Sequence, residues 1–194
     1  MSEREPENEL VAERFVLRLA DAHEAKGVLD YFVRNRAHLA RWEPEPPPPF
    51  YTEAFWVERL ATYRRDREAD RAYRFHVFER PSDRVIGTLG LSNVVRGCFH
   101  SAHFGFAICG SREGEGVMRE ACGLVIEHAF EHLHLHRLEA NHRPENIRSA
   151  ALLRRLGFVP TGYCRDYLLI AGDWVDHVNT QLINARWMPP LPKD

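Results

Sequence analysis

The sequence predicts a single α/β domain of the α+β type, in which helices flank a mixed and mostly antiparallel sheet. The chain has 194 residues, enough for one domain with a sizeable core. Runs that alternate apolar and polar residues, as strands do, are interleaved with runs of helical periodicity. Their order is one strand, two helices, three strands, a helix, a strand, a helix and two strands. Two of the strand pairs are joined by hairpin turns, which does not fit a doubly wound parallel sheet.

The N-terminal region is expected to consist of a flexible arm followed by the first strand of the domain. Residues 1–12 are rich in acidic and other polar side chains and are predicted to form a flexible arm. The run at 13–19 alternates apolar side chains with arginines and predicts the first strand. The domain itself is expected to cover 13–188.

Two helices are expected after this strand. Asp21 is a good N-cap residue, and apolar positions at helical spacing follow it as far as Val33. Thr52 is expected to cap the second helix, whose apolar side reaches Tyr63. Between them, 42–50 contains four consecutive prolines, which cannot continue a helix and predict a stiff surface loop.

The rest of the chain supplies most of the predicted sheet. The runs at 74–79 and 84–92 predict two strands joined by a turn at 80–83, and a third strand is expected at 102–108. The elements expected after that are a glycine-rich turn, a helix to about His132, a strand at 136–141, a helix from Asn146 to Gly157, and a hairpin of 167–170 with 174–178.

The composition limits the classes of protein to which this chain can belong. Apolar residues make up 44% of the chain, charged residues 28%, and the net charge is −2. This balance gives no basic field for nucleic acid, and no apolar run approaches the roughly 18 residues that cross a bilayer. The four cysteines show no C-x-x-C spacing, which indicates reduced thiols. We therefore expect a cytoplasmic protein that contacts neither nucleic acid nor membrane directly.

The glycine-rich turn, 110–118, is the most informative stretch. It connects a strand to a helix, and a helix N-terminus presents unpaired N–H groups whose dipole favours an anion. Gly114 and Gly116 have no side chains, so a phosphate could approach the backbone closely. The turn therefore predicts a phosphate-binding site.

Several motifs together resemble one family. These are a strand at Phe104–Ile108, the turn at Glu113–Met118, a strand at His136–Asn141, Asn-x-x-Ser at Asn146–Ser149, and Leu-Gly-Phe at Leu156–Phe158. This order resembles the GNAT superfamily of N-acetyltransferases. The runs RFVLRL, HLARWEP, LSNVVRGCFHSAHFGF and GYCRDYLLIAGDWVDHV further resemble its RimJ/RimL branch, the ribosomal-protein N-acetyltransferases.

The resemblance implies the GNAT fold and acetyl-CoA as cosubstrate, without a metal. The residues it implies for cofactor binding are Ala107, Ile108, Arg112, Gly114, Gly116, Val117, Met118, Asn146 and Ser149. When the family pattern Gln/Arg-x-x-Gly-x-Gly/Ala is laid on the turn, Glu113 stands first, Gly116 fourth and Met118 last. Because Glu113 and Glu115 should repel a pyrophosphate, we expect their side chains to point to solvent, with Arg112 and Arg119 offsetting part of their charge.

Acetyl transfer to an amine needs a proton acceptor, donors to the thioester oxygen and a proton for the thiolate. His103 is the first candidate base, because an imidazole titrates near pH 6.5; His100 and Asp166 are alternatives. Each could equally be an ordinary packed or solvated residue. By the resemblance, Ser149 could protonate the thiolate, and Tyr167 is a further donor.

Two other features allow competing interpretations. His128 and His132 lie four residues apart, which is a metal-ligand spacing, but a solvated helix face explains them better because no H-E-x-x-H pattern is present. By the resemblance, Trp42, Glu43 and the proline run form the rim of the acceptor groove. An acidic rim could attract the positive N-terminus of a peptide, although a packed surface loop fits the same residues.

Three functions remain open at this point. The first is acetylation of a protein N-terminus, with an alanine or serine of a ribosomal protein as acceptor. An α-amine has a pKa near 8 against about 10 for lysine, so an ordinary base suffices for it. The second is acetylation of a small amine, an amino acid or a toxin. The third is a catalytically weakened binding protein. Either a monomer or a homodimer is compatible with the sequence.

Overall fold

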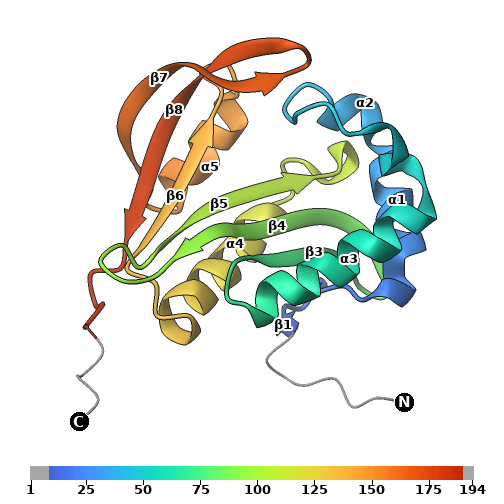
Figure 1. Ribbon diagram of the computed structural model, residues 1–194, viewed down its shortest axis with the longest axis horizontal. Helices are drawn as coiled ribbons and strands as arrows, with labels where there is room; N and C mark the ends of the chain where they lie inside the picture. The colour runs from blue at the N-terminus through green and yellow to red at the C-terminus, as the bar shows by residue number, and fades with distance from the viewer. Residues whose placement is uncertain (1–8, 190–194) are drawn as a thin grey trace.

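A computed structural model describes residues 9–189, and its centre is one eight-stranded sheet (Figure 1). The strand order across the sheet is β1-β2-β3-β4-β5-β6-β8-β7. The strands are β1 (Glu9–Val11), β2 (Phe15–Arg18), β3 (Tyr73–Glu79), β4 (Arg84–Val95), β5 (Ser101–Ile108), β6 (Arg137–His142), β7 (Val159–Ile170) and β8 (Asp173–Ile183). All neighbours are antiparallel except β5 and β6, which confirms the predicted mixed and mostly antiparallel sheet.

Helices cover both faces of the sheet. The α-helices are α1 (Ala25–Arg34), α2 (Arg36–Leu39), α3 (Glu53–Glu68), α4 (Val117–Glu127) and α5 (Ile147–Arg155). The shorter turns are η2 (Ala22–Glu24), η3 (Pro48–Tyr51), η4 (Gly110–Arg112) and η5 (His128–His132). Figure 1 shows α1 and α3 on one face and α4 and α5 on the other. We refer to these as the α1/α3 face and the α4/α5 face.

The core lies on both sides of β3, β4 and β5, where apolar side chains are fully buried. Leu91 of β4 and Leu138 of β6 pack beneath the α4/α5 face, and Trp56 anchors α3 on the opposite side. The rings of Phe104 in β5 and Phe158 after α5 stack 6.0 Å apart. Each aromatic side chain buries a large apolar area, so this stack ties α5 to the central sheet.

The predicted helix ends are found in the structure. The Thr52 hydroxyl accepts a hydrogen bond from Phe55 N at 3.3 Å, and Asn146 Oδ1 accepts one from Ser149 N at 3.1 Å. Gly157 has φ +91°, the left-handed conformation expected after a helix. Local capping chemistry therefore determines where these helices begin and end.

Three boundaries differ from the sequence prediction. Residues 9–11 form the edge strand β1, so the predicted arm does not extend through them, and 1–8 lie outside the described residues. The helix predicted to reach His132 changes at 128 from α to π geometry. The last hairpin is much longer than 167–170 and 174–178 because β7 runs along an exposed edge. Register shifts along β7 also interrupt the apolar alternation that marks a strand.

Candidate functional site

The sheet divides between its two parallel strands. β5 and β6 pair only over Ser101–His103 and Arg137–Glu139. Beyond this point the strands diverge and leave a wedge between them, whose apex lies at His103 and Glu139 (Figure 1). Backbone groups that face the wedge have no neighbouring strand, so a ligand with amide groups could bind there.

The hydrogen bonds at the two ends of β5 show which of its amides face the wedge. His100 O accepts from Arg137 N at 3.1 Å, on the β6 side. Cys109 N donates to Ile86 O at 2.8 Å, on the β4 side. Peptide groups alternate between the two sides of a strand, so even-numbered residues of β5 face β6 and odd-numbered ones face β4.

This alternation corrects one predicted cofactor contact. Ile108 directs its N–H into the wedge, as does Phe106, whereas the Phe104 N–H faces Glu139 of β6, where the two strands still pair. Ala107 directs its N–H toward Thr88 of β4, its antiparallel partner, and is not available to a cofactor. The sequence prediction missed this because the direction of an amide depends on the register of the neighbouring strand.

The glycine-rich turn forms the outer end of the wedge. Gly114 and Gly116 have φ +81° and +80°, and a side chain at either position would meet no atom within 4 Å. Helix α4 begins directly after Gly116, so the N–H groups of its first turn face open space. Val117 and Met118 are buried in the core, and only their backbone is available to an anion. The geometry is that of a phosphate-binding turn.

The two acidic residues of the turn are paired, although we expected them to point freely to solvent. Glu113 accepts from Arg148 of α5 and lies 3.7 Å from His38 Nε2. Glu115 lies 3.5 Å from Arg112, whose guanidinium also contacts Glu79 at 2.5 Å. Arg112 is therefore engaged with two carboxylates, and its assignment to the cofactor is weakened.

The first turn of α5 borders the wedge from the other side. Asn146 uses its side-chain oxygen as the helix cap, which leaves its amide nitrogen available. The hydroxyl of Ser149 has no hydrogen-bond partner among residues 9–189, so it is free to donate. Arg148 reaches across to Glu113, so an ion pair links this helix to the glycine turn.

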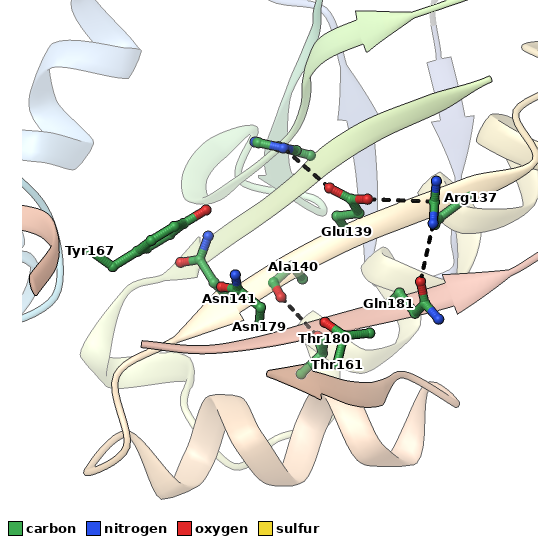
Figure 2. A pocket seen from close by; sticks show the side chains of 10 residues that line it. Arg137, Glu139, Ala140, Asn141, Thr161, Tyr167, Asn179, Thr180 and Gln181 are labelled. Carbon is green, nitrogen blue, oxygen red and sulfur yellow. Dashed lines mark hydrogen bonds and ion pairs between the residues drawn. The ribbon is translucent and has the colours of Figure 1, made fainter. Parts of the chain in front are cut away.

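A polar cavity of about 280 Å³ lies at the apex of the wedge (Figure 2). Its lining consists of His103, Arg137, Glu139, Ala140, Asn141, Thr161, Tyr167, Asn179, Thr180 and Gln181. The structure thus brings together two of the three predicted catalytic residues, His103 and Tyr167. The third, Ser149, is not part of this lining.

His103 is held by neighbours on both sides of its ring. Asn93 Nδ2 lies 3.3 Å from its Nδ1, and Glu139 Oε2 lies 3.4 Å from its Nε2. The other oxygen of Glu139 lies 3.4 Å from Arg137 Nε, and Arg137 donates to Gln181 at 3.4 Å. This chain of polar groups orients an imidazole that could exchange a proton with a substrate.

The two alternative bases lie away from the cavity. His100 packs 5.0 Å from the Trp187 ring. Asp166 sits in the irregular part of β7 with φ +49°, and its N–H donates to Asp176. Neither residue lines the cavity, so neither is placed to act there.

Sequence reasoning missed most of the cavity lining. Arg137, Glu139 and Asn141 occupy alternate positions of β6 and share one face of that strand. Asn179 and Gln181 oppose two of them on β8. The alternation of polar residues in 136–141 was a usable signal, because a strand in the middle of a sheet rarely carries three polar side chains on one face without a role.

The rim predicted around Trp42 lies against the end of β6. Arg143 Nη1 donates to Arg41 O at 3.1 Å, and its guanidinium lies 5.9 Å from the Trp42 ring. Burial raises the pKa of the neighbouring Glu43 from 4.5 to about 7. The loop is therefore attached to the end of β6, and it contains a carboxyl group with a raised pKa.

The described part of the chain shows neither a metal cluster nor a membrane span. Residues 9–189 contain no group of three or more histidine, cysteine or acidic side chains that could hold a metal ion. His128 instead packs against the Phe75 ring at 5.7 Å and lies 5.4 Å from His132. No helix within this range is long and apolar enough to cross a membrane.

Comparison with known proteins gives consistent results. The acetyltransferase (GNAT) domain family matches residues 14–159. The chain is 38% identical to the [ribosomal protein uS5]-alanine N-acetyltransferase of Escherichia coli over 184 residues, which cover 95% of each protein.

Two solved structures share the fold. The ribosomal-protein-S5-alanine acetyltransferase of Vibrio fischeri superposes with TM-score 0.90 and 36% identity, over 93% of this chain and 99% of that one. RimJ of Mycobacterium smegmatis, in complex with CoA-disulfide, superposes with TM-score 0.82 and 28% identity, over 90% and 84%. The predicted fold and family are confirmed, and this chain belongs to the GNAT family of acetyl-CoA-dependent N-acetyltransferases.

Proposed function

We propose that this enzyme acetylates the N-terminal α-amine of a protein, with an N-terminal alanine of a ribosomal protein as the acceptor. The near-full-length similarity to uS5-alanine N-acetyltransferases supports this choice. The observation in the structure that carries it is the polar cavity at the wedge apex. The side chains of His103 and Glu139 within it are 47% and 41% exposed, so an acceptor can reach them from solvent.

Different groups around the wedge would bind different parts of acetyl-CoA. The N–H groups after Gly116 would hold its phosphates, and the amide nitrogen of Asn146 and the N–H groups of Phe106 and Ile108 would hold its amide-bearing arm. Acetyl-CoA supplies the thioester that the amine attacks. Of the N–H groups that face the wedge, that of Phe106 lies nearer the apex and would stabilise the charge that develops on the thioester oxygen.

Proton transfer involves the predicted catalytic side chains. In this proposal the amine and the thioester meet in a ternary complex and react by direct attack. Tyr167, which lines the cavity, supplies a proton to the departing thiolate. Ser149, with its free hydroxyl at the start of α5, is the second candidate donor. His103 binds and orients the acceptor and is the candidate proton acceptor predicted from the sequence.

Steady-state kinetics with matched peptides test this function. One peptide has a free N-terminal alanine, and the other has the same sequence with a blocked N-terminus and one internal lysine. We expect acetyl-CoA consumption and a mass increase only for the first peptide. Faster acetylation of the lysine, or of a small amine such as ethanolamine, would overturn the proposal. Absence of acetyl-CoA binding would favour a binding protein instead.

A further inference from the structure

An arginine near the cavity has no acidic partner among residues 9–189. We propose that Arg74 binds an acidic side chain at the second position of the acceptor peptide, while the first residue of that peptide lies over Gly105. This inference rests on the proposed function, since it requires a peptide acceptor with a free N-terminus. It makes Arg74 and Gly105 the residues that select the acceptor.

Gly105 provides open space in the middle of the sheet. β5 has strands on both of its sides, yet Gly105 is exposed, as is His103 two residues before it. Alternate residues of a strand share a face, so Gly105 opens on the same face as His103 and the cavity. A side chain at Gly105 would meet no atom within 4 Å. The open surface of Gly105 therefore adjoins the acceptor cavity.

Arg74 belongs to the same row of residues across the sheet. Gly105 pairs with Gly90 of β4, and Gly90 pairs with Arg74 of β3. Because Gly90 has no side chain, the Arg74 side chain can lie over it. A Cβ atom at Gly90 would be only 2.7 Å from Arg74 Nη1 and 2.8 Å from Arg74 Cδ. The side chain of Arg74 therefore reaches over β4, in the direction of β5.

The charge of this guanidinium is not neutralised by an acid. Within residues 9–189 Arg74 forms no ion pair and no hydrogen bond, and its guanidinium lies 5.9 Å from the centre of the Tyr63 ring. Arg74 also lines a small cavity of about 20 Å³, together with two further arginines of α3, Arg64 and Arg67, and one acid, Asp21. A guanidinium presents a planar fork of donors that matches a carboxylate. These surroundings favour an acidic ligand.

The spacing of the row fits two residues of a peptide. His103 and Gly90 are diagonal neighbours across β5 and β4, since Gly90 pairs with Gly105 two residues beyond His103. Such neighbours lie about 7–8 Å apart, and an extended chain advances about 3.4 Å per residue. A peptide whose α-amine reaches His103 therefore has its second residue near the guanidinium of Arg74. Its first residue lies over Gly105, where no side chain obstructs it.

The experiment measures kcat/KM for three peptides that begin with alanine followed by aspartate, asparagine or lysine and are otherwise identical. With the wild type we expect the aspartate peptide to exceed the asparagine peptide by about tenfold, the contribution of a charge-assisted hydrogen bond, and the lysine peptide to be the slowest. Arg74→Gln should lose this preference, so that the three peptides react at comparable rates. Arg74→Glu should prefer the lysine peptide.

Arg64→Gln is the matched control. Arg64 lines the same small cavity, but it pairs with Glu68 at 3.1 Å, so its loss should leave the preference unchanged. An equal loss of preference in Arg64→Gln and Arg74→Gln would show a general effect of charge and would overturn the inference. Calorimetric titration with acetyl-CoA verifies that each variant is folded.

A second variant tests the open surface at Gly105. The fold has room for an added methyl group there, so Gly105→Ala should keep or raise the melting temperature. It should nevertheless lower kcat/KM for the alanine peptides by about tenfold or more, mainly through KM, because the methyl group occupies the place of the first residue. Unchanged kcat/KM in this variant would mean that the acceptor does not cross Gly105, and the inference would be wrong.

The same peptides separate this inference from the proposed function. If the wild type acetylates all three equally, Arg74 does not contact the second residue, and the inference is overturned while the proposed function stands. If the wild type acetylates no alanine peptide at all, the proposed function itself fails.

Discussion

Glu43 is half-buried and has no ion pair or side-chain hydrogen bond with any residue from 9 to 189, so its ionisation reduces stability. The pKa of Glu43 is about 7 in the folded protein and 4.5 in the reference state, so folding favours its protonated form. The cost is therefore absent well below pH 4.5, grows as the pH rises, and is complete above pH 7. A shift of this size corresponds to about 3 kcal/mol at most.

Glu43→Gln should accordingly raise the free energy of unfolding strongly at pH 8 and much less at pH 5, which lies only just above the pKa of the unfolded-state carboxyl. Thermal unfolding at the two pH values measures this. Glu45→Gln, at an exposed position, should change neither. Equal stabilisation at both pH values would show that ionisation of Glu43 is not the cause.

For individual residues, the sequence predicts well which residue types belong to the site, and it predicts their surroundings poorly. His103 and Tyr167 were chosen by type and position, and the structure places both in one cavity. Ala107 was wrong because the direction of its N–H depends on register with β4. Glu43 was predicted only as part of an acidic rim, since its burial depends on the packing around its loop. Burial and partners are tertiary properties that no local motif contains.

At the scale of elements, the glycine turn requires a residue that tolerates a positive φ. Gly116 has φ +80°, and an alanine there would be strained by about 1–2 kcal/mol even though the space around it is open. Gly116→Ala should therefore lower the melting temperature and weaken acetyl-CoA binding, because relief of the strain would turn the first N–H groups of α4 away from the phosphates.

A second glycine of α4 is the control for this prediction. Gly123 lies inside the helix and also has no atom near an added side chain, so Gly123→Ala should stabilise the protein by about 0.5–1 kcal/mol. Acetyl-CoA affinity from calorimetric titration should be unchanged in that variant. Equal affinity of the wild type and Gly116→Ala would mean that the turn does not bind the phosphates.

The helices were easier to predict than the last strands, for a physical reason. Helix ends depend on nearby groups, such as the Thr52 and Asn146 caps, and these are visible in the sequence. β7 is an edge strand with two register shifts, so its side chains follow no simple alternation. Its partner β8 pairs with β7 over Asp173–Gln181 and with β6 over Val178–Ile183. Pairing between strands, which no local pattern contains, therefore determines how far these two strands extend.

At the scale of the whole molecule, the sheet consists of two parts that share a narrow connection. β6, β7 and β8 join the rest of the sheet through three paired residues of β5, Ser101–His103. The stacked rings of Phe104 and Phe158 and the ion pair of Glu113 with Arg148 add contacts across the wedge. Exposed ion pairs contribute little to stability, so the ion pair adds little to the three paired residues that join the two parts of the sheet. A ligand in the wedge would contact both parts at once.

Acetyl-CoA should therefore stabilise the region on both sides of the wedge. Hydrogen exchange followed by NMR should show slower exchange with acetyl-CoA for the amides of Phe106 and Ile108, which face the wedge, and for the first turn of α4. The Ala107 amide, which already faces β4, should change much less and is an internal control. Exchange in β8 should also slow, although that strand does not border the wedge, because the ligand links its part of the sheet to the remainder. Protection confined to α4 would mean that the phosphates bind while the arm of the ligand stays outside the wedge. Acetyl transfer at the apex would then require a further closure of the two parts.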